Sequence, residues 1–373
     1  MNLKITTTDL QGMVSKAIEC VSNNKLIPMT SLISIWCSSG VLTLTTTDYT
    51  NYFYTKSANK VDCEDFEVSV LADTFVKLVQ KTTSETITLS VEDNVLTVKG
   101  NGTYKLELPL DENGRPIKFP KKGLEDYSED DLVGTVKIAD IKSIIAVNKN
   151  ALATDMQQPV LTSYYCGDEV VTSNKKIICW NPLKLFNEPL LISGKVMELL
   201  GILTGTSISV YRFDDSYVFK TDVDSLYAPV VDDVNGFPIS SMQSLVESQF
   251  DFSVRLPRKP ILDVLDRLTL FVGAYDKKSI TMTFTPEGML LSSKKSSGSE
   301  LIQGTYDMVK GNQSFSCSIN IEFFQAQLNS IDSEFIDLQY GSPLAIKIVS
   351  GDIIKVVALM NEENSNGEKS SSK

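Results

Sequence analysis

The fold is decided by the first patterned stretch of the chain, residues 2–54, NLKITTTDLQGMVSKAIECVSNNKLIPMTSLISIWCSSGVLTLTTTDYTNYFY. It opens with a short strand, Asn2–Thr6, and continues into a helix whose apolar residues recur at helical spacing, namely Leu10, Met13, Val14, Ala17, Ile18 and Val21. Pro28 ends the helical region, because proline cannot continue a helix. Two β-rich runs, Leu32–Trp36 and Val41–Thr47, then flank a turn at Ser38-Ser39-Gly40. The pattern predicts a unit of strand, helix and hairpin.

The same plan returns five times along the chain. Strands that open the later units are expected near Phe66, Val133, Leu190, Phe252 and Ser314. The steps from Phe66 to Leu190 and from Leu190 to Ser314 are both 124 residues (190 − 66 and 314 − 190). Six similar units in pairs predict an α+β fold of three tandem domains, each with two helices packed on antiparallel sheets. An unrelated α+β chain with evenly spaced hairpins is the alternative.

The expected domain boundaries are 1–123, 132–245 and 250–360. Residues 361–373 are Ser, Asn, Glu and Lys with a single Gly, and this tail is expected to be disordered because it has nothing to bury. The 373 residues and the hydrophobic content of 42% are typical of a folded protein with two or three domains. We expect a cytoplasmic protein, since no apolar run is long enough to span a bilayer and the N-terminal residues do not resemble a signal peptide.

The cysteine and histidine contents restrict the chemistry. Six scattered cysteines form no Cys-x-x-Cys pair, and we expect buried free thiols rather than disulfides or a metal site. The chain has no histidine, which removes the commonest general base and the commonest metal ligand and excludes a catalytic triad of the usual kind. No Gly-rich phosphate loop precedes a helix. We therefore expect no enzyme activity, no catalytic residue, no metal and no cofactor.

The net charge of −12 argues against a protein coated with basic residues for nucleic-acid binding. It leaves open a protein whose few basic residues gather on one concave surface.

Local motifs resemble those of the bacterial β sliding clamps, the processivity rings of replicative DNA polymerases. The resemblance rests on Pro28 after the first helix, on Leu42-Thr43-Leu44 with Thr47-Asp48, on Gln158-Pro159-Val160-Leu161-Thr162, on Val171 to Ile177, and on Gly236-Phe237-Pro238. Asn174 and Lys176 replace the glycine and arginine of that family, and Met242 or Gln243 stands where it has a basic residue. These departures indicate a divergent member, and bacterial and phage origins both stay open.

The resemblance implies a homodimeric ring closed head to tail, with twelve helices around a hole that holds double-stranded DNA. Sequence-independent attraction to phosphates suits a ring that slides. The candidate DNA-binding cations on the inner face are Lys16, Lys25, Lys77, Lys81, Lys142, Lys149, Lys195, Lys259 and Arg267. Acidic residues lie on the same helices, so ordinary solvated surface is the alternative for any one of these cations.

A partner site and a dimer interface are also implied by the resemblance. Short peptide motifs of the DNA polymerase and the clamp loader would bind a pocket formed by Leu161, Thr172, Asn174, Lys176, Ile177, Pro238, Met242, Val356, Val357 and Met360. The alternative for these residues is ordinary core. The dimer would join Tyr104, Leu106 and Leu108 on a first-domain edge strand to Leu270, Phe271 and Val272 of the third domain.

The sequence therefore predicts a DNA sliding clamp that tethers the replicative polymerase and other DNA-processing proteins. The alternative function is a monomeric interaction scaffold with the same fold and no DNA. A closed dimer would have twice the chain mass of 41.2 kDa, which separates the two.

Overall fold

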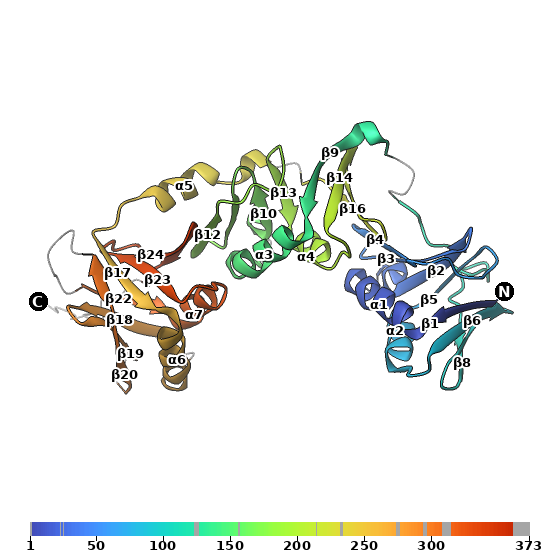
Figure 1. Cartoon of the computed structure of the whole chain (residues 1–373), viewed down its shortest axis with the longest axis horizontal. Coiled ribbons are helices and arrows are strands. Elements are labelled where there is room, and N and C mark those ends of the chain that lie inside the picture. The colour runs from blue at the N-terminus through green and yellow to red at the C-terminus, as the bar shows by residue number, and fades with distance from the viewer. Residues whose placement is uncertain are drawn as a thin grey trace, which may run out of the picture. The chain divides into compact units, whose positions relative to one another are not determined.

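The computed structural model describes residues 2–22, 24, 26–122, 127–155, 157–213, 215–231, 234–273, 277–293, 297–307 and 315–360. The chain packs as two compact units, Met1–Lys142 with Lys195–Asp232, and Ser143–Gly194 with Asp233–Lys373 (Figure 1). Each unit contains one long antiparallel sheet and one four-stranded antiparallel sheet. Lys25 and the expected tail, residues 361–373, lie outside the described residues.

The long sheet of the first unit brings together strands from two expected domains. The four-stranded sheet has the order β1 (Asn2–Thr6), β6 (Thr86–Glu92), β7 (Val95–Lys99), β8 (Thr103–Glu107). The eight-stranded sheet has the order β5 (Phe66–Leu71), β2 (Leu32–Ser38), β3 (Val41–Thr47), β4 (Tyr52–Lys56), β16 (Asp224–Pro229), β15 (Ser216–Lys220), β14 (Ser207–Phe213), β9 (Leu132–Lys137). Its continuity depends on the pairing of β4 with β16.

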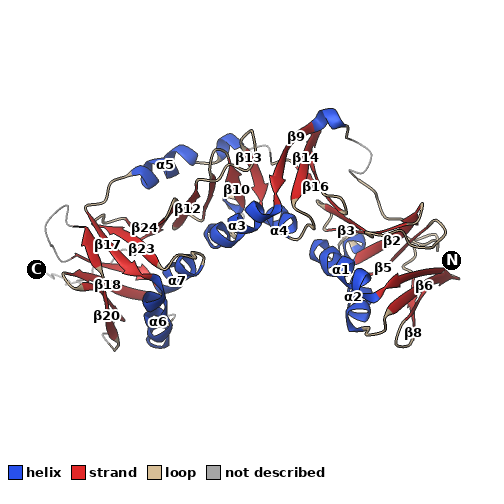
Figure 2. Ribbon diagram, viewed as in Figure 1, coloured by secondary structure: helices blue, strands red, loops and turns tan. Residues whose placement is uncertain are grey.

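Helices α1 (Thr7–Ala17) and α2 (Ala72–Lys81) pack side by side in the first unit (Figure 2). The Thr6 hydroxyl caps α1 by accepting a hydrogen bond from the backbone N–H of Asp9. Four residues of the predicted stripe, Leu10, Met13, Val14 and Ala17, are buried, whereas Ile18 and Val21 lie beyond the end of α1 and are half-buried. The predicted turn after β2 has positive φ angles at Ser39 (53°) and Gly40 (78°), as a type I′ hairpin requires.

The second unit has the same organisation. Its nine-stranded sheet has the order β13 (Leu190–Ser193), β10 (Ser163–Cys166), β11 (Val170–Ser173), β12 (Ile177–Asn181), β25 (Ile353–Ala358), β24 (Ala345–Ser350), β23 (Phe335–Tyr340), β17 (Phe252–Pro257), β21 (Thr305–Asp307). The four-stranded sheet has the order β20 (Ser299–Gln303), β19 (Gly288–Ser293), β18 (Ser279–Thr285), β22 (Phe315–Asn320). The pairing of β12 with β25 joins strands of two expected domains.

The remaining helices are α3 (Ile138–Asn148), α4 (Gly194–Gly201), α5 (Ile239–Glu247), α6 (Arg258–Leu268) and α7 (Ile321–Asn329). The six strand-then-helix units are confirmed as β1–α1, β5–α2, β9–α3, β13–α4, β17–α6 and β22–α7. The sequence did not predict α5 or the strands β4, β12, β16, β20, β21 and β23. It also placed a strand from Val160, whereas Pro159–Thr162 forms a 3₁₀ turn and β10 begins at Ser163.

The expectation for the cysteines is correct for four of the six. Cys20, Cys166, Cys179 and Cys317 are free and buried. For Cys37 and Cys63 it is wrong, because these two residues form a disulfide. They are separated by 26 residues, so no short motif pairs them, and the fold brings them together as the segment after β4 returns to the end of β2.

None of the described helices is long and apolar enough to cross a membrane. Within the described ranges, no group of three or more Cys, Asp or Glu side chains is arranged to hold a metal ion.

Candidate nucleic-acid interface and partner site

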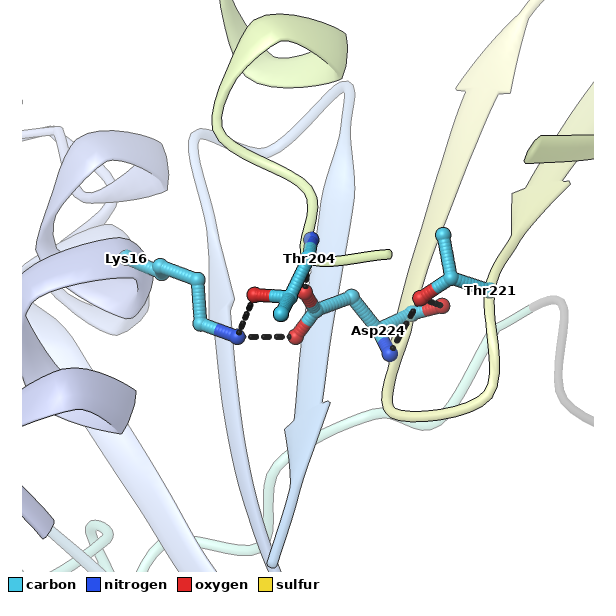
Figure 3. Close-up of polar contacts among 4 residues, drawn as sticks. All are labelled: Lys16, Thr204, Thr221 and Asp224. Atoms are coloured by element: carbon cyan, nitrogen blue, oxygen red, sulfur yellow. Dashed lines mark hydrogen bonds and ion pairs between the residues drawn. The ribbon is translucent and has the colours of Figure 1, made fainter. Parts of the chain in front are cut away.

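Lys16 is the candidate cation whose surroundings differ most from a free surface lysine. It lies in the last turn of α1, and its Nζ is 2.6 Å from Oδ1 of Asp224 and 2.9 Å from Oγ1 of Thr204 (Figure 3). The Asp224 carboxylate is fully buried, and only 18% of the Lys16 side chain is exposed. Oδ2 of Asp224 accepts a second hydrogen bond, from the backbone N–H of Thr204 at 2.7 Å. Lys16 is therefore neutralised within the chain.

Two other candidates are also paired with carboxylates, both at the surface. Lys77 contacts Asp73 one helical turn away at 2.7 Å. Arg267 donates two hydrogen bonds, at 2.7 and 2.6 Å, to the carboxylate of Glu300. Those bonds hold the pKa of Glu300 below its usual value and raise that of Arg267. An exposed pair of this kind contributes little to stability, but it reduces the positive charge offered to a phosphate.

Four of the remaining candidates, Lys81, Lys142, Lys195 and Lys259, are exposed and form no ion pair with a carboxylate of the described residues. Lys81, Lys142 and Lys259 lie on α2, α3 and α6. Lys195 lies on α4 and donates a hydrogen bond of 2.6 Å to the backbone carbonyl of Glu19, a contact that leaves its charge uncompensated. Lys149 begins the 3₁₀ helix η4 (Lys149–Ala151) and has a further polar or electrostatic contact.

Sequence reasoning missed two basic residues beside these helices. Arg258 opens α6, and its guanidinium donates to the backbone carbonyls of Ser333 and Leu328. Lys278 forms an ion pair with Glu322 in the first turn of α7. Both cations are engaged within the chain. Glu322 is 44 residues from Lys278, and the partners of Arg258 are 70 and 75 residues away, so no local sequence signal indicates either set of contacts.

Six of the ten candidate pocket residues are buried within the second unit. Leu161, Thr172, Ile177, Met242, Val356 and Val357 are all buried. Ile177 and Val357 belong to the main core of the unit, and the Thr172 hydroxyl donates to the carbonyl of Asn148 at 3.0 Å. For these side chains the structure gives the alternative role, which is packing. Their part in a peptide site stays a prediction.

The other four candidates are at least partly accessible. Asn174, Lys176, Pro238 and Met360 are exposed or half-buried. The Asn174 side chain accepts hydrogen bonds from the backbone N–H groups of Lys176 and Ile177 and so shapes the turn between β11 and β12. The backbone of Lys176 pairs with the N–H of Ala358 at the end of β25, at 2.8 Å.

Apolar surface continues next to this turn. The Lys176 ammonium lies 5.5 Å from the ring centre of Phe323. Leu344 is 69% exposed, and its carbonyl accepts the backbone N–H of Leu359. Helix α5, which the sequence did not predict, packs on β25, and Phe237 before it stacks on Tyr165. The accessible partner surface therefore comprises Asn174, Lys176, Leu344, Leu359 and Met360.

The predicted edge strand of the first domain is confirmed as β8, which ends its four-stranded sheet. Tyr104 is 47% exposed and Leu106 half-buried, but Leu108 is buried in its own chain and is not available to a partner. Leu270 and Phe271 are exposed, in the 3₁₀ helix η7 (Thr269–Phe271), while Val272 packs partly on the core. Phe271 lies beside Gly298, which precedes the edge strand β20.

Comparison with solved structures shows what this arrangement is similar to. The DNA polymerase III beta subunit of Thermotoga maritima matches with a TM-score of 0.83 at 17% identity, over 97% of this chain and 99% of that one. The DNA polymerase sliding clamp of Bacillus subtilis matches with a TM-score of 0.80 at 16% identity, over 97% and 99%. The chain has the sliding-clamp fold. The beta subunit of the DNA polymerase of Streptococcus pyogenes gives 0.82 at 16% identity, over 97% and 100%.

Residues 1–113 match the family model described as DNA polymerase III beta subunit, N-terminal domain. A comparison with curated proteins finds no match. The sliding-clamp fold thus extends over the part of the chain that the family model does not reach. It includes β20, η7 and the strands around the accessible partner surface.

Proposed function

We propose that this protein is a DNA sliding clamp, in which two copies close into a ring around duplex DNA and tether a DNA polymerase. The observation that carries the proposal is the fold match over 97% of the chain to structures described as polymerase beta subunits. The six strand-then-helix repeats, grouped in pairs, support it, because a ring of two chains would then be built from equivalent blocks.

The DNA contact would come from lysines that no carboxylate of the described chain neutralises. Lys81, Lys142, Lys195 and Lys259 meet this condition, whereas Lys16, Lys77 and Arg267 do not. Phosphate contacts by mobile lysines carry no sequence information, so they do not fix the ring at one register. The net charge of −12 disfavours binding elsewhere on the surface.

Ring closure would use two of the sheet edges, β8 and β20. Strand β8 pairs only with β7, and β20 pairs only with β19, among the described residues. Tyr104 on β8 and Leu301, Leu270 and Phe271 at or near β20 expose apolar surface at these edges. An unpaired edge with large apolar side chains is a surface on which a second chain can pair. These edges favour the ring over the monomeric scaffold.

The accessible partner surface defined above would take an apolar peptide segment of the polymerase or of the clamp loader. Leu344, Leu359 and Met360 supply apolar contacts, and Asn174 and Lys176 supply polar ones at the rim. A micromolar contact is enough, because a polymerase on the same DNA presents its peptide at an effective concentration of about millimolar. We also infer a non-enzymatic, cytoplasmic protein.

Retention on DNA tests the proposal. The protein is loaded onto nicked circular DNA with a clamp loader, or allowed to thread onto a linear duplex whose ends are then blocked. The expected result is retention that ends when the DNA is cut or unblocked. An ordinary DNA-binding protein stays bound after the cut, and a monomeric scaffold is not retained at all. Elution at twice 41.2 kDa in gel filtration is the accompanying expectation.

A further inference from the structure

Each long sheet is continuous because one strand pair joins two successive domains, β4 with β16 in the first unit and β12 with β25 in the second. We call these pairs the first and second seams. A lysine lies at each of them, half-buried Lys16 at the first and fully buried Lys355 at the second, and each connects the seam to the last turn of a helix on the other side of the domain boundary.

At the first seam the lysine is on the helix. Lys16 of α1 reaches Asp224, the first residue of β16, and Thr204 in the segment before β14. A second contact runs the opposite way, from Lys195 of α4 to the carbonyl of Glu19 just after α1. Two lysines, one from each side, therefore connect the end of α1 to the neighbouring domain.

At the second seam the lysine is on the strand. Lys355 of β25 is fully buried, and its ammonium donates to the carbonyl of Val147 at 2.7 Å, to Oε1 of Gln327 at 3.1 Å and to the hydroxyl of Ser330. These three acceptors match the three N–H donors of an ammonium group. Val147 is in the last turn of α3, and Gln327 and Ser330 are at the end of α7.

The placement of Lys355 has an electrostatic cause. The C-terminal end of a helix carries partial negative charge, and the ammonium lies at two such ends. Burial still lowers its pKa, while the neighbouring thiol of Cys179 on β12 is the titratable group that faces it. Burying a cation without a carboxylate partner costs free energy of folding. The position of Lys355 therefore indicates a role other than stabilising the fold.

The two arrangements share one position. Lys16 is the tenth residue of the eleven-residue α1, and Val147 is the tenth residue of the eleven-residue α3. We propose that Lys16 with Asp224 at the first seam, and Lys355 at the second, are positioning residues that fix the end of the first helix of one domain against the seam strand of the next. The donor is on the helix at the first seam and on the strand at the second. The inference rests on the proposed division into clamp domains. The shape of the proposed inner surface would depend on how each helix is oriented relative to the seam strand of the next domain.

Hydrogen–deuterium exchange on the free, full-length protein tests it without DNA or a partner. Lys16→Met and Asp224→Asn should each speed exchange about tenfold or more in β4, β16 and the last turn of α1, the factor for losing one hydrogen bond to a charged group. The second seam should be unchanged. Lys355→Met should speed exchange in β12, β25 and the ends of α3 and α7, and should leave the first seam unchanged. Lys16→Arg should restore most of the protection at the first seam.

Two matched controls use lysine contacts that do not cross a seam. Lys347→Met removes a buried lysine from β24 whose Nζ donates to the Ser248 carbonyl, and Asp73→Asn breaks an exposed pair on α2. Neither should change exchange at a seam. Should Lys355→Met fail to fold, Ser330→Ala removes one acceptor and should give the same local pattern. Uniformly faster exchange across a unit, or unchanged exchange at the seams, would overturn the proposal, whatever the DNA-retention assay gives.

Discussion

The proposed DNA contacts are tested most sharply by comparing a free lysine with a paired one on the same helix, α2. Lys81 has no carboxylate partner among the described residues, whereas Lys77 pairs with Asp73. Four unpaired lysines per chain make eight in a ring of two, so the slope of log K against log salt is at most about −7 (eight contacts at about 0.9 each). Lys81→Gln changes both copies and should reduce the slope by up to about 1.8.

The control is the charge-neutral double variant Lys77→Gln with Asp73→Asn, which removes the pair without changing the net charge of the helix. It should leave the slope unchanged, because the pair offers no free charge to a phosphate. The assay is fluorescence anisotropy of a labelled duplex with open ends at several salt concentrations. If the double variant reduces the slope as much as Lys81→Gln does, the assignment of free and paired lysines is wrong.

Four further outcomes are expected. Leu106→Glu on the β8 edge should shift the protein toward the monomer in gel filtration, whereas Thr88→Glu on the central strand β6 should not; equal effects would contradict the edge assignment. Asp224→Ala should destabilise the first unit by about 3 kcal/mol, which is the low end for a broken buried pair because Lys16 is partly exposed. Urea unfolding followed by the fluorescence of Trp36, in a Trp180→Phe background, measures this loss. A loss below about 1 kcal/mol would contradict a buried pair. Burial lowers the pKa of Lys355, so between that lowered pKa and the ordinary one the unfolded chain binds more protons than the folded chain. The free energy of unfolding, relative to that of Lys355→Met, should therefore rise as pH increases through this window. A difference that does not change with pH would show that Lys355 does not titrate there. Burial also raises the pKa of Cys20 and Cys317 to about 12, so a thiol reagent should label no buried cysteine in the native protein and four after unfolding without reductant; six would exclude the disulfide.

The six helices that follow the opening strands of the repeats were predictable because each carries its own signal, whereas α5 was missed. The apolar stripe of α1 follows a 3.6-residue period and Thr6 caps its start, so local sequence defines where the helix begins. The expected end at Pro28 is wrong, because α1 ends at Ala17 and Pro28 begins the next 3₁₀ helix. The strands that were missed behave differently. Strands β4, β12 and β16 are mostly buried on both faces and lie at the seams, so their pairing depends on residues far away in sequence. A short run without alternation gives no periodic signal.

The candidate site was predictable in type and less so in detail. Sequence placed the lysines on helices correctly, but Lys16 and Asp224 are 208 residues apart, and no local pattern indicates that they pair. Lys355 lies in the run Ile353–Ala358, where a single lysine is typical of an exposed strand position, yet it is fully buried because two helix ends supply its acceptors. Tertiary contacts, which the sequence does not display, decide which cations are free.

The distribution of free and paired cations also bears on how an acidic protein could hold DNA. A strongly basic inner surface would bind phosphates tightly and slow movement along the duplex, because every step would break many contacts. Asp9 on α1, Glu19 just after α1 and Asp73 on α2 accompany the lysines, so we expect the attraction to DNA from this region to be weak. A protein with weak attraction to DNA stays on the duplex for long only if it encircles the duplex and cannot leave it sideways. The same charge pattern that argues against an ordinary DNA-binding protein is therefore the pattern expected of a closed ring. Removing acids from the helices, as in Asp9→Asn, should accordingly strengthen binding to open-ended duplex while slowing diffusion along it; faster or unchanged diffusion at the higher affinity would contradict this account.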